Sequence, residues 1–330
     1  MISAYILLLV TIIASCALQV HAVPTMLRNH IKAAGAAVSA VESVTSGPVI
    51  AEPNHHNPLN HTKIGSLSIN DRKHHVCGVN AKCVVSYSLY GPENPRYTVG
   101  AIRNAQLVKE VYEGWVVRYY YEKDKVSPVL VQDLINLGAE MFPIGPVHGA
   151  AGMFARFKVS EDAGVDRYIV RDADSRLSMR EKFAVDAWIK SGYAVHELRD
   201  HPSHCRTING GMWGGTRGAI KDISGLMAKY HQVNYNDDQK FLSTIVWNLI
   251  KDNQISHDSC CCTQFPNAHP FPTRRIGWEH IGAVIDLHEA PRAGDTWRFL
   301  NHKAQGLPRD QHANWQNPPK CRLKPEWTHG

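Results

Sequence analysis

The chain has 330 residues, and its 36 Lys and Arg against 30 Asp and Glu give a formal net charge of +6 at neutral pH. Hydrophobic residues make up 44% of the chain and charged residues 20%, as in ordinary soluble globular proteins. These values exclude a collagen-like chain, a wholly disordered chain and a protein with many membrane spans. The positive excess is spread along the chain and no basic run alternates with aromatic residues, so no nucleic-acid partner is expected.

The first residues form a nearly unbroken apolar run from Ile2 to Val20, followed closely by Ala22. Signal peptidase recognises small residues one and three positions before its cut, so residues 1–22 are predicted to be a signal peptide. An uncleaved signal anchor stays open as an alternative, because the run is long enough to span a bilayer, and only then would the protein be attached to a membrane. Either way, the protein is expected in the lumen of the secretory pathway (Golgi or endoplasmic reticulum) or outside the cell.

Residues 23–75 are predicted to be a flexible stem. They combine an Ala-, Val- and Ser-rich stretch with a Pro-, Asn- and His-rich stretch, and large hydrophobic residues are few. Within the stem, Asn60, His61 and Thr62 form an N-glycosylation sequon. We therefore expect Asn60 to be glycosylated in the lumen.

Seven cysteines remain once Cys16 of the predicted signal peptide is set aside. They are Cys77, Cys83, Cys205, Cys260, Cys261, Cys262 and Cys321. In an oxidising compartment disulfide bonds are the default, and an odd number leaves at least one cysteine over. Cys77 and Cys83 flank a short turn and could pair with each other. A zinc site at the triplet 260–262 is disfavoured, because no second cysteine pair stands at zinc-finger spacing.

Strand-like and helical patterns alternate along the middle of the chain. The expected strands are 82–87, 115–121, 140–142, 167–170 and 194–201, and the expected helices are 98–114, 131–138, 152–159, 179–192 and 237–252. This alternation predicts a single α/β domain over residues 76–290, with a mostly parallel central sheet flanked by helices. Residues 291–330 are polar and Pro-rich, and we expect them to form a C-terminal extension.

Two aspartates, Asp172 and Asp174, come directly after the strand predicted at 167–170. Ligands of parallel sheets bind beyond the carboxyl ends of the strands, so these carboxylates stand where a ligand is expected. Paired carboxylates can share Mn²⁺ or Mg²⁺, whose other positions are filled by oxygens of a nucleotide diphosphate. A solvated turn is the alternative. Three nearby arginines could add phosphate contacts, namely Arg167, Arg171 and Arg176.

A glycine-rich run follows at residues 208–215. Gly210 and Gly211 would let the backbone approach a ligand closely, and Trp213 offers a flat apolar face on which a sugar ring can stack. The alternative is a plain glycine turn beside a core tryptophan.

Two later segments also carry polar side chains. Asp238 and Gln239 stand at the start of the helix predicted over 237–252, where an acidic residue caps the helix and could also face a sugar. His257 could supply a third metal ligand, and a structural histidine is the alternative reading.

The order of these motifs resembles the GT-A class of nucleotide-sugar glycosyltransferases. The segments are RDADSR at 171–176, GGMWG at 210–214, DDQKFLSTIVW at 237–247 and HDS at 257–259. The order is also similar to that of the glycogenin and lipopolysaccharide galactosyltransferase family, over about residues 82–286. The resemblance implies a Rossmann-like GT-A fold. It also implies transfer of a sugar from a nucleotide-diphosphate donor, expected to be a UDP-sugar, to a glycan, protein or lipid hydroxyl.

The resemblance further implies roles for individual residues. Asp172 and Asp174 would bind Mn²⁺ or Mg²⁺, and His257 would join them, although HDSCCC lacks the Gly and Lys of the family's late histidine stretch. Asp238 and Gln239 would lie beside the reacting carbon. The donor sugar and acceptor would meet Gly210, Gly211 and Trp213, and the nucleotide would meet Ser86, Tyr87 and Tyr90.

Two other functions stay open. A phosphatase or phosphotransferase of the haloacid-dehalogenase type also places Asp-x-Asp after a strand, with the first Asp as nucleophile. Against it, Ser175 follows the motif where Thr or Val is usual, and a long α/β stretch precedes it. A secreted, non-catalytic carbohydrate-binding protein would account for the sequon and for tryptophans such as Trp213, Trp315 and Trp327.

Overall fold

The computed structural model describes residues 77–78, 80–230, 234–277 and 279–296. The predicted signal peptide, the stem with Asn60 and most of the predicted C-terminal extension lie outside these residues. Within the described part of the chain, no helix combines the length and the apolar character needed to cross a membrane.

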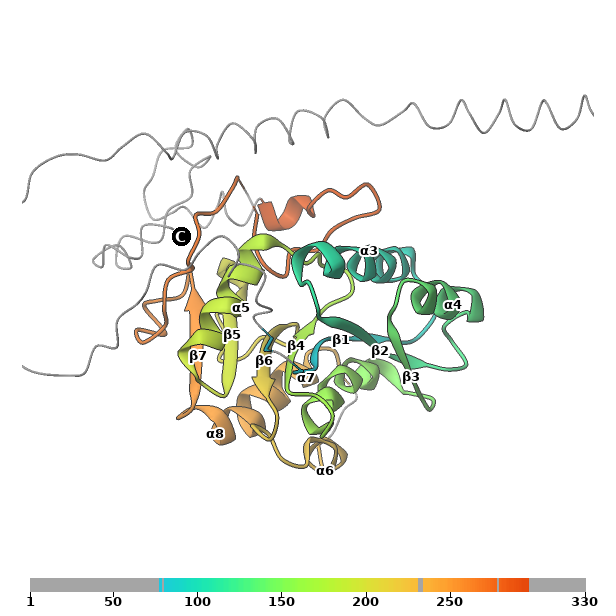
Figure 1. Ribbon diagram of the computed structural model, residues 1–330, viewed down its shortest axis with the longest axis horizontal. Coiled ribbons are helices and arrows are strands. Elements are labelled where there is room, and N and C mark those ends of the chain that lie inside the picture. The colour runs from blue at the N-terminus through green and yellow to red at the C-terminus, as the bar shows by residue number, and fades with distance from the viewer. Residues whose placement is uncertain (1–76, 79, 231–233, 278, 297–330) are drawn as a thin grey trace, which may run out of the picture. The chain divides into compact units, whose positions relative to one another are not determined.

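A seven-stranded sheet forms the centre of the described residues (Figure 1). Its strands are β1 (Cys83–Leu89), β2 (Val116–Glu122), β3 (Glu140–Ile144), β4 (Arg167–Arg171), β5 (Val195–Arg199), β6 (Met212–Thr216) and β7 (Gln254–Asp258). They lie in the order β3-β2-β1-β4-β6-β5-β7. Only β6 runs antiparallel to its neighbours, β4 and β5. The predicted α/β fold with a mostly parallel sheet is confirmed.

Strand β1 shows why the sheet is covered on both sides. All seven of its residues are buried, and successive side chains of a strand point to opposite faces. Val84 packs in one hydrophobic cluster with Phe154, whereas Val85 packs in the other cluster with Ala101 and Leu130. A strand with helices on both faces has no solvent side, and β1 is accordingly apolar apart from Ser86 and Ser88.

Helical segments cover both faces of the sheet (Figure 1). The α-helices are α3 (Pro95–Val111), α4 (Pro128–Asn136), α5 (Met179–Ser191), α6 (Ile223–Ala228), α7 (Asp237–Phe241) and α8 (Trp247–Ile250), and the other segments are η2 (Gly149–Glu161), η3 (Pro202–His204) and η4 (Leu242–Val246). Local sequence determines where α3, α4 and α5 begin. The side chains of Asn94, Ser127 and Ser178 each accept a hydrogen bond from a backbone N–H in the first turn of their helix. Gly192, at a φ of 78°, ends α5 in the left-handed conformation.

Two of the predicted helices differ from the structure in kind. The helix predicted over 237–252 is divided into α7, a π-helical segment (η4) and α8. The helix predicted over 152–159 is a longer 3₁₀ segment, η2. Hydrophobic spacing identifies a helical face but does not distinguish these tighter and wider turns from an α-helix.

Two disulfide bonds lie within the described residues. Cys77 pairs with Cys83 across six positions, and Cys205 pairs with Cys261 across 56. Cys260 is buried and carries a free thiol. The expectations of disulfide bonding and of a leftover cysteine are therefore confirmed.

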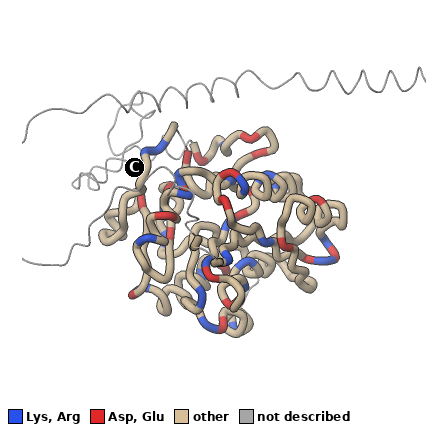
Figure 2. Tube along the Cα trace, viewed as in Figure 1, with Lys and Arg blue, Asp and Glu red and all other residues tan. Residues whose placement is uncertain are grey.

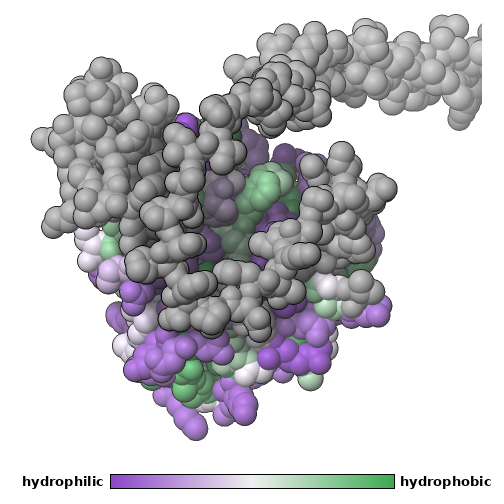
Figure 3. Space-filling model, turned by 60° about the vertical axis from the view of Figure 1, so that its left-hand side comes forward, coloured by the Kyte–Doolittle hydropathy of each residue, from purple (hydrophilic) through white to green (hydrophobic). Residues whose placement is uncertain are grey.

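Charges are distributed along the described chain rather than gathered in one place. In Figure 2, the basic (blue) and acidic (red) residues are scattered along the described trace among many uncharged residues. In the view of Figure 3, hydrophilic and hydrophobic residues are mixed on the described surface. Figure 2 shows no single region of the described chain in which the positive charges gather.

Candidate active site

Three segments that are far apart in the sequence meet at one edge of the sheet. Asp172 comes directly after β4, and Gly210 and Gly211 directly precede β6. Asp238 and Gln239 lie in the first turn of α7. Because β6 is antiparallel to β4, its start lies beside the end of β4, and the backbone N–H of Gly210 donates to Oε1 of Gln239 at 3.0 Å. The structure thus brings together the aspartate, glycine and Asp-Gln motifs.

The two glycines are needed because side chains occupy the space beside them. A Cβ added at Gly211 would lie 2.0 Å from Oδ2 of Asp172. One added at Gly210 would lie 2.6 Å from Oδ2 of Asp238 and 2.3 Å from Nε2 of Gln239. Non-bonded heavy atoms do not approach so closely, so each added carbon would displace a carboxylate.

Arg156 joins these carboxylates, and the sequence reasoning missed it. Its guanidinium, 6% exposed, forms an ion pair with Asp172 and another with Oδ2 of Asp238 at 3.1 Å. The segment η2 that carries it is held against β1, where Ser86 Oγ donates to the Arg156 carbonyl and the Arg156 N–H donates to Ser88 Oγ. Arg156 is the only charged residue in the apolar run 153–157, and a lone charge in such a run indicates a buried ionic contact.

Asp174 has a different cationic partner, Arg96 in the first turn of α3, which the sequence reasoning also missed. The Asp174 carbonyl accepts from the N–H of Ile285 at 2.9 Å. Ile285 belongs to a hairpin in which the N–H of Arg292 donates to the carbonyl of Val284 at 2.9 Å. This hairpin crosses the predicted boundary between the domain and the C-terminal extension at 290, so residues beyond that boundary pack close to the site.

The carboxylates repel one another at this edge of the sheet. Burial and the nearby Asp172 charge raise the pKa of Asp174. Burial raises the pKa of Asp238, where Arg156 acts in the opposite direction and Asp172 adds to the rise. Burial is the main cause of both rises, and the neighbouring charge adds to it. The ion pairs set three carboxylates against two arginines, so a bound cation would offset the remaining negative charge.

The donor chemistry of Asp172 and Asp174 fits Mn²⁺ or Mg²⁺, which prefer carboxylate oxygens. Among the described residues, no three His, Cys, Asp or Glu side chains are arranged to hold a metal ion. Two carboxylates would leave the other coordination positions to water or to oxygens of a ligand. Asp172 remains accessible, since its side chain is 43% exposed.

Of the three residues predicted to meet the nucleotide, only Tyr90 lies near the carboxylates. Burial raises its pKa to about 12, with Asp238 and Asp172 adding to the rise against Arg156. The predictions for Ser86 and Tyr87 are corrected, because β1 continues to Leu89 and both residues lie inside the strand. Both side chains are fully buried, and the ring of Tyr87 stacks on that of Tyr119 with centroids 5.2 Å apart.

The three arginines predicted to meet phosphates have other partners. Arg171 is fully buried and pairs with Glu181 at 3.0 Å, so its assignment is corrected to a structural ion pair. Arg167 stands at the opposite end of β4 from Asp172 and donates to the carbonyl of Cys77, which also removes it from the site. Arg176 pairs with Glu289 at 2.8 Å, and that carboxylate neutralises its charge.

Trp213 belongs to the core and not to the site. The residue has no exposed surface, and its ring packs edge-on against Phe157 and Tyr168 with centroids 5.6 Å away in both cases. A ring without an exposed face cannot stack on a sugar. The alternative reading, a glycine turn beside a core tryptophan, is correct for this residue.

His257 is also remote from the aspartates. It lies in β7, is 3% exposed, and its Nδ1 is 2.8 Å from Nε2 of His196. The ring of Phe271 also packs against it, with a centroid distance of 5.8 Å. The prediction of His257 as a metal ligand is therefore corrected to a buried structural histidine.

This histidine pair is expected to make the fold sensitive to acid. Burial lowers the pKa of His257 to about 3 and that of His196 well below its usual value, whereas both take up protons near pH 6.5 when unfolded. Their stabilising effect is complete above pH 6.5 and is lost as the pH falls below it, by up to about 1.4 kcal/mol per pH unit for each histidine. Denaturant unfolding at pH 7, 6 and 5 measures this slope.

The test compares a double variant, His196→Phe with His257→Phe, with a control variant in which the exposed His288 is replaced by Phe. We expect the double variant to lose less stability between pH 7 and 5 than the His288 variant. Burial raises the pKa of Glu197 to about 8, which acts in the opposite direction but is common to both proteins. Parallel pH profiles for the two variants would contradict the assignment.

No protein-family model matches the chain, and no curated protein is similar to it in sequence. Solved structures with a similar chain path exist, at low identity. Glucosyl-3-phosphoglycerate synthase from Mycobacterium tuberculosis, in complex with phosphoglyceric acid, is 10% identical with a TM-score of 0.36 over 59% of this chain and 75% of that chain.

Two other solved structures are similar to this chain at the same low level. The glycosyltransferase GlyE of Streptococcus pneumoniae is 13% identical with a TM-score of 0.36, over 53% of this chain but only 45% of that chain. The 4-diphosphocytidyl-2C-methyl-D-erythritol synthase of Anaerococcus prevotii is 12% identical with a TM-score of 0.35, over 49% of this chain and 82% of that one. Identities and TM-scores this low do not identify an activity, so the proposed function below is based on the residues of the site.

Proposed function

We propose that the protein is a metal-dependent glycosyltransferase that uses a nucleotide-diphosphate sugar, with UDP as the expected nucleotide. The observation that carries the proposal is the meeting of Asp172, Gly211 and Asp238 at the carboxyl end of β4, where such a sheet binds its ligand. The acceptor would be a hydroxyl of a glycan, protein or lipid. The two disulfides are consistent with a place in the secretory pathway or outside the cell.

Each part of the site has a use in this reaction. Mn²⁺ or Mg²⁺ held by Asp172 and Asp174 would supply the positive charge that a departing nucleoside diphosphate requires. Arg156 and Arg96 keep these carboxylates in place through their ion pairs. Asp238 is almost fully buried, so its part is to hold Arg156, and through it Asp172, by an ion pair.

A thermal-shift screen of UDP, GDP and CDP with and without Mn²⁺ tests this proposal. We expect one nucleotide together with Mn²⁺ to stabilise the protein, by about 2.7 kcal/mol when the ligand is at 100 times its Kd. The Asp172→Asn, Asp174→Asn double variant should lose both this shift and sugar transfer. The control is Asp166→Asn, which removes a half-buried carboxylate paired with Arg217 at the other end of β4.

The outcomes separate the three functions considered. Equal shifts in the double variant and the control would contradict a site at Asp172 and Asp174. Hydrolysis of an aryl phosphate without any nucleotide response would favour a phosphatase. Glycan binding that is indifferent to nucleotide and metal would favour a non-catalytic lectin-like protein.

A further inference from the structure

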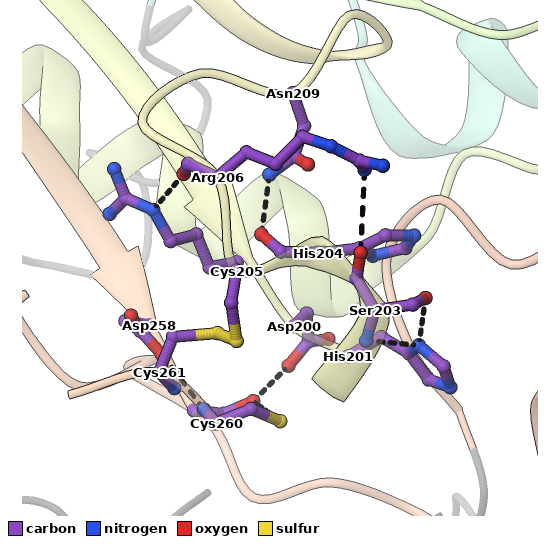
Figure 4. The surroundings of a disulfide bond; sticks show 12 residues. Asp200, His201, Ser203, His204, Cys205, Arg206, Asn209, Asp258, Cys260 and Cys261 are labelled. Atoms are coloured by element: carbon purple, nitrogen blue, oxygen red, sulfur yellow. Dashed lines mark hydrogen bonds between the residues drawn. A yellow bond between two sulfur atoms is a disulfide. The ribbon is translucent and has the colours of Figure 1, made fainter. Parts of the chain in front are cut away.

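The loop that carries Gly210 and Gly211 is tied covalently to a distant strand. This loop, residues 200–211, connects β5 to β6. Cys205 in its middle forms a disulfide with Cys261, which follows β7, 56 positions later in the sequence (Figure 4). The disulfide thus lies five residues before the first of the two site glycines.

The Cys261 side of the bond is itself fixed. The N–H groups of Cys260 and Cys261 donate to the same oxygen of Asp258, Oδ1, at 2.8 and 2.6 Å (Figure 4). Asp258 is the last residue of β7 and is fully buried. Cys261 is 2% exposed, whereas Cys205 is only partly buried. The disulfide therefore anchors the loop to the rigid end of a strand.

The two ends of the loop are held by side-chain hydrogen bonds. Asp200, fully buried, accepts from both Nε and Nη2 of Arg180 at 2.8 Å and from Ser259 Oγ at 2.7 Å. Asn209 Nδ2 donates to the carbonyls of Leu198 and His204 at 3.1 and 2.8 Å. These contacts fix the loop's entry and the residue just before Gly210.

The middle of the loop has fewer anchors. Arg199 donates to the carbonyls of Arg206 and Thr207, at 2.6 Å in both cases. Those bonds hold the backbone from one side, and the disulfide at Cys205 holds it from the other. The tolerance is small, because a Cβ placed at Gly211 would already collide with Asp172. A shift of the loop by about 1 Å is enough to cost a catalyst two orders of magnitude in rate.

We propose that Cys205–Cys261 is a positioning disulfide for the active site, and that activity depends on its oxidised state. The bond holds Gly210 and Gly211 against Asp172, Asp238 and Gln239, and neither sulfur touches the reacting groups. Opening it with a dithiol transfers two electrons and two protons, which gives two cysteine thiols and the cyclic disulfide of the reductant. This inference rests on the proposed glycosyltransferase function.

The test compares the Cys205→Ser, Cys261→Ser variant with the Cys77→Ser, Cys83→Ser variant. The second pair is the matched control, because Cys83 begins β1 and lies at the amino end of its strand. We expect kcat of the first variant to fall at least ten-fold while its Kd for UDP with Mn²⁺ stays within two-fold. The control should keep kcat within two-fold. Equal kcat losses, or unchanged kcat in both, would overturn the proposal.

Hydrogen exchange, measured without substrate, separates this inference from the proposed function. The N–H groups of Gly210 and Met212, bonded to Gln239 and Asn209, should exchange faster only in the Cys205 variant. Unchanged exchange there would refute positioning even in an active enzyme. Faster exchange in a protein that transfers no sugar would uphold positioning and reject the function.

Graded reduction of the unaltered chain covers the case in which a variant fails to fold. Dithiothreitol is added stepwise, the free thiols are alkylated, and mass spectrometry identifies which disulfides have opened. We expect transfer to fall in proportion to the opening of Cys205–Cys261 and to return on reoxidation. Full transfer with that bond open would overturn the proposal.

Discussion

Replacing Gly211 with alanine is expected to lower the proposed sugar transfer by at least about 100-fold, because the added carbon displaces the carboxylate that we propose as a metal ligand. A Cβ at this position would lie 2.0 Å from Oδ2 and 2.4 Å from Cγ of Asp172. The same carbon would be 3.0 Å from the Asp172 backbone nitrogen, which cannot rotate away. The carboxylate must therefore turn, and the metal proposed to bind there would lose a ligand. Transfer assayed against Mn²⁺ concentration should show a higher metal requirement.

The matched control for this variant is Gly145→Ala. A Cβ at Gly145 would meet no atom within 4 Å, and the residue is not in the left-handed conformation. Alanine there is expected to leave transfer unchanged and to raise stability by up to about 1 kcal/mol through the unfolded chain. Gly210→Ala should resemble Gly211→Ala, since its Cβ would meet Asp238 and Gln239. Equal activity of the Gly211 and Gly145 variants would contradict the close packing of the site.

The sequence was sufficient for the architecture and for part of the site. Alternating strand and helix patterns predicted a mostly parallel sheet, because a strand covered on both faces is rich in apolar residues and a covering helix is apolar on one face. The position of Asp172 after β4 followed from the same pattern. Glycines beside polar motifs marked the close approach at Gly211, since no other residue fits there.

The rest depended on contacts between distant residues, which no local pattern encodes. Arg171 directly precedes Asp172, and Trp213 follows Gly211 by two positions, so closeness in sequence alone did not show that both side chains are buried in the core. The faces that side chains enter depend on the pairing of the strands. His257 was predicted to be a metal ligand because the sequence does not show that its ring lies beside that of His196 on β5. Arg156 was missed because its partners lie 16 and 82 positions away.

Replacing Arg156 with methionine is expected to destabilise the fold by about 3 kcal/mol at pH 7 or above, because it leaves a buried carboxylate without its partner. Arg156 is 6% exposed and Asp238 is 3% exposed, so water cannot replace the lost cation there. Asp172, at 43% exposed, contributes less to this cost since solvent screens it. Denaturant unfolding at fixed pH measures the change in the free energy of unfolding.

The pH dependence identifies the cause. The pKa of Asp238 is already raised by burial, and removing the Arg156 charge raises it further. A carboxyl whose folded pKa lies above its unfolded value binds a proton more readily when folded, so stability increases as the pH falls through the folded pKa. The cost of Arg156→Met should therefore be greatest at alkaline pH and shrink on acidification. A deficit that stays constant with pH would indicate lost packing instead.

A double variant separates the charge from the packing. In Arg156→Met with Asp238→Asn, the buried negative charge is gone, so we expect this protein to be more stable than Arg156→Met alone. The coupling between the two changes should exceed about 1.5 kcal/mol, well beyond the scatter of independent sites. Asp237→Asn is the control in the same background, because Asp237 accepts from the N–H of Asn234 and pairs with Lys240. If Asp238→Asn and Asp237→Asn change the stability of Arg156→Met equally, the ion pair between Arg156 and Asp238 does not stabilise the site.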